Sequence, residues 1–296
     1  MDYYASGKLL LFGEYLVLKG ARSLAIPLKY GQDMKVLLSH SNEINWLSKE
    51  KKKEWFSARF TTDLKVIEST DKQIASSLIR LLDIIKNQKP DLFNQGRDFI
   101  LNTDFPLQWG FGTSSTLISL LAQWSKTNPY ILLESTFGGS GYDVACATAK
   151  TPIVFQTTNK SAVEIGLSSE ITSKLLFIYS GQKQKSKPEV MRFKEIDVES
   201  DQIEEMNELV DSVTVCEEIG KFELLINQSE ALLSKVLTLE PIKNSIFNDY
   251  PYSLKSLGAW GGDFFMATYR NESNAKEYFS KRGYGIQFTY DQIIKR

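Results

Sequence analysis

Between Trp109 and Thr116 the chain reads WGFGTSST, and an apolar segment suited to a buried helix follows directly. Glycines let a backbone approach an anion closely, and the first N–H groups of a helix point outward without partners. The helix dipole adds roughly half a positive charge at the same place. The four hydroxyl residues can hold phosphate oxygens or Mg²⁺. The segment therefore predicts a phosphate-binding loop, with an ordinary helix cap as the alternative.

This loop matches neither of two common phosphate motifs. It lacks the lysine of a GxxxxGK[ST] loop, and it lacks the GxGxxG of a dinucleotide-binding turn. Its interpretation therefore depends on the other glycine-rich parts of the chain.

Two further segments place charged residues in glycine-rich, otherwise apolar sequence. Ser6 to Tyr15 reads SGKLLLFGEY, so that Lys8 opens an apolar run and Glu14 follows a glycine. Phe137 to Ala145 reads FGGSGYDVA, which places Asp143 at the end of a glycine-rich loop. Solvated charges are not expected in such surroundings. These residues are therefore candidates for a site.

The spacing of apolar residues predicts strands and helices in both halves of the chain. A helix at 74–85 should stop before Pro90, and a second helix follows the glycine and hydroxyl cluster at 116–124. Residues 204–237 should be largely helical. Strands are expected at 8–12 and 15–18 around a turn, at 43–47 and 54–60 as a hairpin, at 99–101, at 174–179 and after the glycines at 258–262.

Composition limits the function classes that remain. A length of 296 residues favours two domains, and 35 basic against 36 acidic residues argue against nonspecific nucleic-acid binding. His40 is the single histidine, which excludes a His-rich zinc site and leaves little room for a Ser-His-Asp triad. Cys146 and Cys216 do not form a CxxC pair and are expected to be buried thiols in a reducing compartment.

No targeting segment is evident in the sequence. The longest uncharged run, 105–125, is long enough to span a bilayer, but it contains Pro106, two glycines and several hydroxyl residues. It is better explained as a loop followed by a buried helix. We therefore expect a cytoplasmic protein with neither a nucleic-acid nor a membrane partner.

Three of the segments together resemble the GHMP kinases, a family named for galactokinase, homoserine kinase, mevalonate kinase and phosphomevalonate kinase. Ser6 to Tyr15 is similar to the first family motif, P-G-K-[IVL]-x-L-x-G-E-[HY]. Gln108 to Thr116 resembles the second, G-x-G-L-G-S-S-A-x, and Gly258 to Asp263 resembles the third, G-A-G-G-G-G. The motifs occur in family order across nearly the whole chain. Tyr15 and the GSGYDVA loop look most like phosphomevalonate kinase, with mevalonate kinase close behind.

The resemblance implies an α+β, two-domain GHMP kinase fold. Residues 1–170 would form an N-terminal domain like domain 2 of ribosomal protein S5 and carry the phosphate loop, and residues 171–296 would form a ferredoxin-like C-terminal domain. The implied activity is transfer of the γ-phosphoryl group of ATP, with Mg²⁺, to mevalonate or phosphomevalonate in the isoprenoid precursor pathway. The implied partner is thus a small-molecule substrate, and we expect a monomer or homodimer. The alternatives are a kinase for another small alcohol, of the sugar or homoserine type, and a non-catalytic sensor of nucleotide or ligand.

Carried over position by position, the resemblance implies that Asp143 is the general base and that Lys8 sits beside it. An alcohol is a poor nucleophile at neutral pH, so a carboxylate must take its proton while a cation stabilises the alkoxide. Mg²⁺ is expected on Ser114 and Glu134, with a structural or capping role for Glu134 as an equal alternative. The remaining implied contacts are Gly110, Gly112, Thr113, Ser114 and Ser115 with ATP, and Glu14, Tyr15, Lys183 and Gly261 with the substrate.

The chain also departs from the family pattern. Gln108, Trp109, Phe111 and Thr113 replace small or aliphatic residues of the second motif, and Trp260 and Asp263 replace glycines of the third. A carboxylate that faces the phosphates would repel them, so Asp263 must point away or the third loop meets the nucleotide differently. Trp260 could close over the substrate, with plain packing as the alternative.

Overall fold

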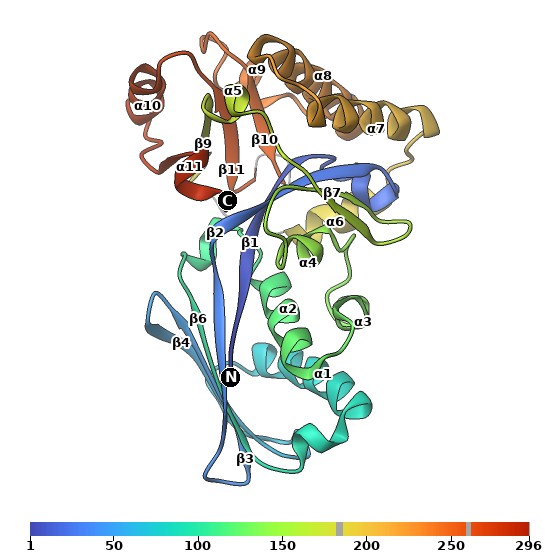
Figure 1. Ribbon diagram of the computed structural model, residues 1–296, viewed down its shortest axis with the longest axis vertical. Coiled ribbons are helices and arrows are strands. Elements are labelled where there is room, and N and C mark those ends of the chain that lie inside the picture. Colours follow the sequence, from blue (N-terminus) through green and yellow to red (C-terminus); the bar gives the residue numbers. More distant parts are fainter. Residues whose placement is uncertain (182–185, 259–261, 296) are drawn as a thin grey trace. The chain divides into compact units, whose positions relative to one another are not determined.

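The computed structural model describes residues 1–181, 186–258 and 262–295 (Figure 1). Lys183, Trp260 and Gly261, singled out above, lie outside the described residues. The chain divides into two compact units, each built from separate stretches of sequence. The first comprises 1–7, 30–107 and 111–148, and the second comprises 8–29, 108–110 and 149–296. The predicted domain boundary after residue 170 stays a prediction.

The first unit contains a twisted sheet in the order β5-β4-β3-β6-β2. Strands β3 and β4 form the predicted hairpin, β6 runs parallel to β3, and β6 pairs antiparallel with β2. The strands span Glu43–Glu50 (β3), Lys53–Thr61 (β4), Val66–Ser69 (β5) and Arg97–Thr103 (β6), and β2 covers Arg22–Leu38.

Helices α1 (Lys72–Gln88) and α2 (Thr113–Ser125) lie against one face of this sheet (Figure 1). The carboxylate of Asp71 caps α1 by accepting from the N–H groups of its first turn, and α1 ends before Pro90, as predicted. Aromatic rings join the layers, because Phe99 of β6 stacks on Trp46 at 5.0 Å and meets Trp124 of α2 edge-on at 4.8 Å. The predicted helices and strands of this unit are therefore confirmed.

Two short helices complete the first unit beside α2. They are α3 (Pro129–Glu134) and α4 (Tyr142–Cys146), and both pack against α2. A 3-10 turn, η2 (Pro90–Phe93), follows α1, and another, η3 (Leu107–Trp109), precedes the glycine and hydroxyl cluster. Strand β1 (Asp2–Phe12) begins in the first unit and continues into the second.

The second unit contains an antiparallel sheet in the order β10-β11-β9-β12. All five residues of β9 and of β11 are buried, which explains their continuous apolar sequences. In the same unit, residues 22–25 of β2 pair with β7, which pairs with β8. The strands span Ile153–Gln156 (β7), Ser161–Glu164 (β8), Leu175–Tyr179 (β9), Leu254–Leu257 (β10), Phe264–Thr268 (β11) and Gln287–Thr289 (β12).

The helices of the second unit include a pair, α7 and α8, that pack on each other, and α8 also contacts β10. These two helices occupy most of the region that was predicted to be helical, with a break at 215–218. The helices span Ser169–Thr172 (α5), Ser186–Lys194 (α6), Ser200–Thr214 (α7), Ile219–Leu237 (α8), Ile242–Ser245 (α9), Glu272–Ser280 (α10) and Tyr290–Ile293 (α11).

The strand predicted at 15–18 is wrong. The structure has a 3-10 turn there, η1 (Leu16–Lys19), because Gly13 and Tyr15 both adopt positive φ angles, 88° and 58°, and turn the chain back. A side chain at Gly13 would come within 2.5 Å of the carbonyl oxygen of Arg22, so only glycine fits this turn. Leu16 and Val17 are buried, so their apolar character reflects a packed turn and not a strand.

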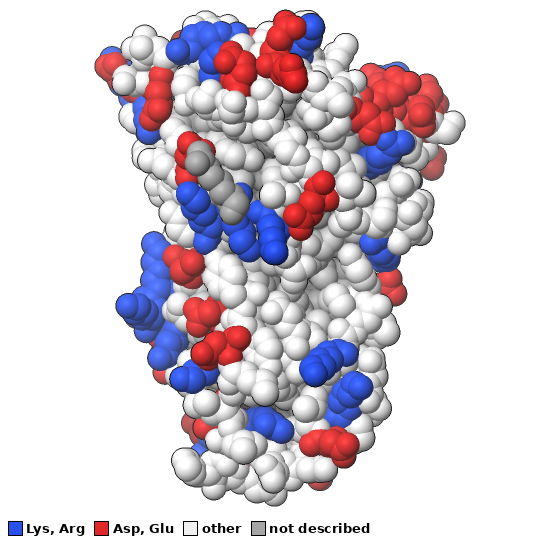
Figure 2. All heavy atoms as spheres, in the orientation of Figure 1, with Lys and Arg blue, Asp and Glu red and all other residues white. Residues whose placement is uncertain are grey.

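Surface charge and the cysteines agree with the sequence. Basic and acidic side chains are interspersed on the face drawn in Figure 2. Acidic side chains, drawn in red, gather at the upper right, where Figure 1 shows helix α7. Cys146 and Cys216 are free and buried, as expected. In the described part of the chain, no helix is long and apolar enough to cross a membrane.

Candidate functional site

The N-terminus of α2 lies directly behind the two glycines of the second motif. Gly112 precedes the helix with φ +93°, and within the described chain no side chain caps the first turn. The hydroxyl of Ser115 donates back to the Gly112 carbonyl at 2.8 Å, whereas Ser114 is exposed. Gly112 thus occupies the cap position itself, and the choice between a phosphate-binding loop and an ordinary helix cap stays a prediction.

Asp143 lies in the first turn of α4, next to a glycine that its surroundings require. Gly141 has φ +97°, and a Cβ there would come within 2.9 Å of the ring of Tyr130. Burial, and secondly the negative charge of Asp143, raise the pKa of Tyr130, so the tyrosine and the carboxylate lie close enough to interact. One carboxylate oxygen of Asp143 also accepts from the backbone N–H of Val144 at 3.0 Å.

Lys8 follows the point where β1 is tied to α4. Within the first unit, the N–H of Ser6 donates to the carbonyl of Ala147 at 2.8 Å. Lys8 is half-buried and belongs to the second unit, whereas Asp143 belongs to the first. The pairing of Lys8 with Asp143 therefore stays a prediction.

Glu134 is the last residue of α3 and is exposed. It does not cap the start of that helix, because the side chain of Asn128 accepts from the N–H of Tyr130 at 2.9 Å. Glu134 and Ser114 both belong to the first unit, and both offer oxygen atoms to solvent. Their predicted role as Mg²⁺ ligands stays a prediction.

Glu14 is buried in an ion pair. Its carboxylate lies 2.9 Å from the ammonium of Lys255, which lies 3.4 Å from the carboxylate of Glu230. Burial raises the pKa of Glu14 to about 7, although the charge of Lys255 opposes the shift. The predicted contact of Glu14 with a substrate stays a prediction. Sequence reasoning missed Lys255 and Glu230, although a lysine within the run SLKSL, residues 253–257, was a signal.

Tyr15 is also largely buried, at 7% exposure. Its ring lies 5.1 Å from that of Phe193 in α6, and its φ of 58° is unusual for a residue other than glycine. Such a conformation is held only where the surrounding packing favours it. The predicted substrate contact of Tyr15 stays a prediction, and those of Lys183 and Gly261 fall outside the described residues.

Asp263 of the third motif lies against Gly110 of the second. A Cβ built on Gly110 would be 1.7 Å from Oδ2 of Asp263, so the carboxylate rests on the face of this glycine. The N–H of Ser180 donates to the backbone carbonyl of Asp263 at 2.9 Å and holds the turn. The carboxylate therefore does not point away from the second motif.

The departures at Gln108 and Trp109 have a packing explanation. The ring of Trp109 meets those of Phe288, Phe264 and Tyr179 at 5.4, 6.2 and 6.3 Å, all within the second unit. The hydroxyl of Tyr179 donates to the carbonyl of Gln108 at 3.4 Å. These contacts anchor residues 108–110 on the antiparallel sheet immediately before the glycine and hydroxyl cluster.

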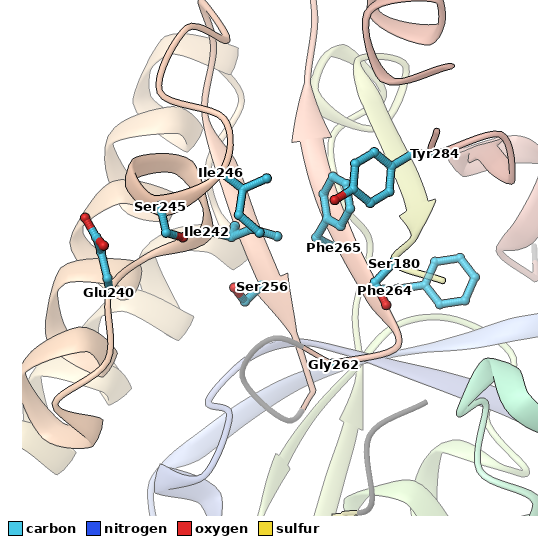
Figure 3. A pocket seen from close by; sticks show the side chains of 10 residues that line it. All are labelled: Ser180, Glu240, Ile242, Ser245, Ile246, Ser256, Gly262, Phe264, Phe265 and Tyr284. Atoms are coloured by element: carbon cyan, nitrogen blue, oxygen red, sulfur yellow. The ribbon is translucent and has the colours of Figure 1, made fainter. Parts of the chain in front are cut away.

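A pocket of about 190 Å³ lies beside the third motif, between β10, β11 and α9 (Figure 3). No sequence signal predicted it. Its wall combines aromatic and aliphatic side chains with several hydroxyls, and Glu240 lies at one edge (Figure 3). The lining residues are Ser180, Glu240, Ile242, Ser245, Ile246, Ser256, Gly262, Phe264, Phe265 and Tyr284.

No family model matches the sequence, and no curated protein sequence matches it. Solved structures of three kinases match over nearly the whole chain, each with a TM-score of 0.71. Mevalonate kinase of Methanococcus jannaschii is 18% identical, with 97% of this chain and 96% of that chain covered. Phosphomevalonate kinase of Streptococcus pneumoniae, in complex with phosphomevalonate and AMPPNP, is 16% identical, with 97% and 99% covered.

The third is galactokinase of Lactococcus lactis, complexed with galactose, which is 11% identical with 99% of this chain and 92% of that chain covered. The predicted α+β architecture is thus confirmed by structures that share few residues with this chain. From end to end, the protein has the GHMP kinase fold.

Proposed function

We propose that the protein is an ATP-dependent GHMP-type kinase whose acceptor is of the mevalonate type, mevalonate or phosphomevalonate. The observation that carries the proposal is the N-terminus of α2, which follows Gly110 and Gly112 and has no side-chain cap among the described residues, within this fold. Phosphate oxygens carry the charge in phosphoryl transfer, so N–H groups that point at them supply much of the stabilisation. The backbone of 112–115 would hold the phosphates.

Mg²⁺ would be held by Ser114 and Glu134 together with the nucleotide. A hydroxyl and a carboxylate are hard oxygen ligands, and Mg²⁺ usually keeps several waters while it bridges phosphates. When bound, Mg²⁺ would neutralise charge on the transferred phosphoryl group.

Asp143 would accept the proton of an acceptor hydroxyl, and Lys8 would stabilise the oxygen as it attacks. A phosphate acceptor behaves differently, because its oxygens are already ionised and need no base. The dependence of turnover on Asp143 therefore separates a hydroxyl acceptor from a phosphate acceptor. Another small alcohol is the alternative within the kinase class.

A sensor that binds a nucleotide or ligand without catalysis is the second candidate function. The position of Asp263 favours it, because a carboxylate on Gly110 opposes the approach of phosphates to the second motif. A kinase would need its nucleotide to meet this region with a cation between the charges, or with Asp263 displaced.

The deciding experiment is ADP release from Mg-ATP with mevalonate, phosphomevalonate, homoserine and galactose as acceptors. Asp143→Ala is the test variant, and Asp83→Ala, an exposed position on α1, is the matched control. We expect turnover with mevalonate or phosphomevalonate that the control retains. ATP binding without turnover on any acceptor would favour the sensor, and absence of ATP binding would contradict both the kinase and a nucleotide sensor.

A further inference from the structure

Three charged side chains meet in the interior of the second unit. Lys255 is fully buried, Glu14 is 1% exposed and Glu230 is 4% exposed. The ammonium lies 2.9 Å from Glu14 and 3.4 Å from Glu230, and it also sits 5.1 Å from the centre of the Phe12 ring. We call Glu14, Lys255 and Glu230 the buried triad.

The triad connects two of the predicted motifs. Glu14 belongs to the turn of the first motif, directly before Tyr15, and Lys255 lies in β10, whose end leads into the third motif at Gly258. Glu230 comes from α8, and its carboxylate lies 3.4 Å from the ammonium of Lys255 in β10. A movement of any one of these side chains would therefore be transmitted to both motifs.

The charges of the triad do not balance. Two carboxylates face one ammonium, and the charges that act on Glu14 are the positive charge of Lys255 and the negative charge of Glu230. The other polar side chains buried on α8 and β10 are the hydroxyls of Ser229 and Ser256, which carry no charge. An unbalanced buried charge is unfavourable, so the folded triad tends to bind one extra proton.

Each group responds to this arrangement in the direction that electrostatics requires. Burial raises the pKa of Glu14 to about 7 and raises the pKa of Glu230. Burial alone would lower the pKa of Lys255, but the charges of Glu14 and Glu230 raise it. The lysine thus stays charged, and the two carboxyl groups share the extra proton.

We propose that Lys255 is a positioning residue for the phosphoryl transfer. Through its ion pairs with Glu14 and Glu230, it holds the turn of the first motif, strand β10 before the third motif and helix α8 in fixed relative positions. The extra proton completes this arrangement, and its loss loosens the turn and the strand. This inference rests on the proposed kinase function only where its test measures catalysis.

Stability alone does not account for such a triad. Buried ion triads can often be replaced by apolar or neutral residues of similar volume without loss of stability, whereas removal of one partner leaves a charge uncompensated. A structural role and a positioning role therefore differ in a testable way. Neutral replacement of all three charges should preserve the fold in both cases, but it should impair catalysis only if the charges position the motifs.

The first test compares wild type with the neutral variant Glu14→Gln/Lys255→Met/Glu230→Gln. The matched control is Glu223→Gln/Arg270→Met, which removes a partly exposed carboxylate–guanidinium pair whose carboxylate also comes from α8. We expect the neutral variant to keep its circular dichroism spectrum but to lose at least tenfold in kcat/KM, and the control to stay within threefold. A folded neutral variant with wild-type kcat/KM would overturn the proposal.

A milder variant covers the case in which the neutral one fails to fold. Glu230→Gln leaves one carboxylate for one ammonium, so the extra proton is no longer needed. We expect kcat/KM of this variant to lose the decrease that wild type shows as pH rises through neutrality. An unchanged pH profile would contradict the proposal.

Hydrogen exchange tests the inference even if the protein turns over no acceptor. Corrected for intrinsic rates, exchange of peptides covering 9–18 and 254–258 should increase at least threefold in wild type between pH 6 and pH 8, and should not do so in Glu230→Gln. Equal behaviour of the two proteins would overturn the inference. Failure of the proposed function alone would leave this difference intact.

Discussion

Asp263 places its carboxylate on the face of Gly110, where a Cβ would be only 1.7 Å from Oδ2. Both residues belong to the second unit, and they come from different glycine motifs of the sequence. Gly110 is thus required for the approach of an acidic side chain, in addition to any role toward a nucleotide.

Gly110→Ala should destabilise the protein, because its Cβ meets Asp263 and because φ is +68° at this position. Steric conflict and backbone strain of this kind each cost on the order of 1–3 kcal/mol. Urea unfolding would measure the loss. Asp263→Gly in the same chain should recover the steric part, and a double variant no more stable than Gly110→Ala would contradict the contact.

Asp263→Asn should strengthen ATP binding. The substitution keeps the size of the side chain and removes a negative charge beside the second motif, which opposes phosphates. We expect roughly a tenfold lower Kd for Mg-ATP, which corresponds to about 1.4 kcal/mol. Calorimetric titration would measure it at low salt, with Asp83→Asn on α1 as the control. Weaker binding would indicate instead that the carboxylate helps to hold the nucleotide or its cation.

Asp143→Asn should reduce turnover by about 10²- to 10⁴-fold if the acceptor is a hydroxyl, because the amide cannot take up its proton. Steady-state assays with mevalonate and phosphomevalonate would measure kcat for both proteins. A loss of less than fivefold would argue against a general base and would fit a phosphate acceptor, whose oxygens are already ionised.

The free energy of unfolding should fall as pH rises from about 4.5 to about 7. Glu14 has a folded pKa of about 7 against an ordinary value of 4.5, so in this window the folded state keeps a proton that the unfolded state releases. One such proton contributes a slope of about 1.4 kcal/mol per pH unit at most. Chemical denaturation across this range would reveal the slope.

Glu14→Gln provides the control for that measurement. The amide does not titrate and leaves Lys255 paired with Glu230, so the contribution of Glu14 to the slope should vanish. Above pH 7, the free energy of unfolding of this variant should be no lower than that of wild type. A slope equal to that of wild type would show that other groups cause the pH dependence.

Local sequence was sufficient for most of the secondary structure. The apolar spacing of α1, its Asp71 cap and Pro90 beyond its end act within a few residues, so the helix could be predicted without knowledge of its partners. The same holds for the β3–β4 hairpin and for α2 behind its glycines. The strand expected at 15–18 failed because buried apolar residues at a tight turn resemble a short strand when viewed locally.

For the candidate site too, some features could be predicted from local sequence and others could not. The motifs with Lys8, Asp143 and the glycines before α2 are readable in the sequence, because backbone freedom and ionisable groups must occupy fixed places along the chain. The positions of Glu14 and Asp263 were not readable. One lies buried against Lys255 and the other rests on Gly110, and both partners are far away in sequence.

The linear order of residues thus determined which chemical groups the protein carries and which local turns and helices present them. Only the tertiary structure decided which charges meet, because burial and charge pairing depend on distances between segments that the chain brings together on folding. For this protein the tertiary structure makes Glu14 a member of a buried triad, and it gives Gly110 an acidic neighbour.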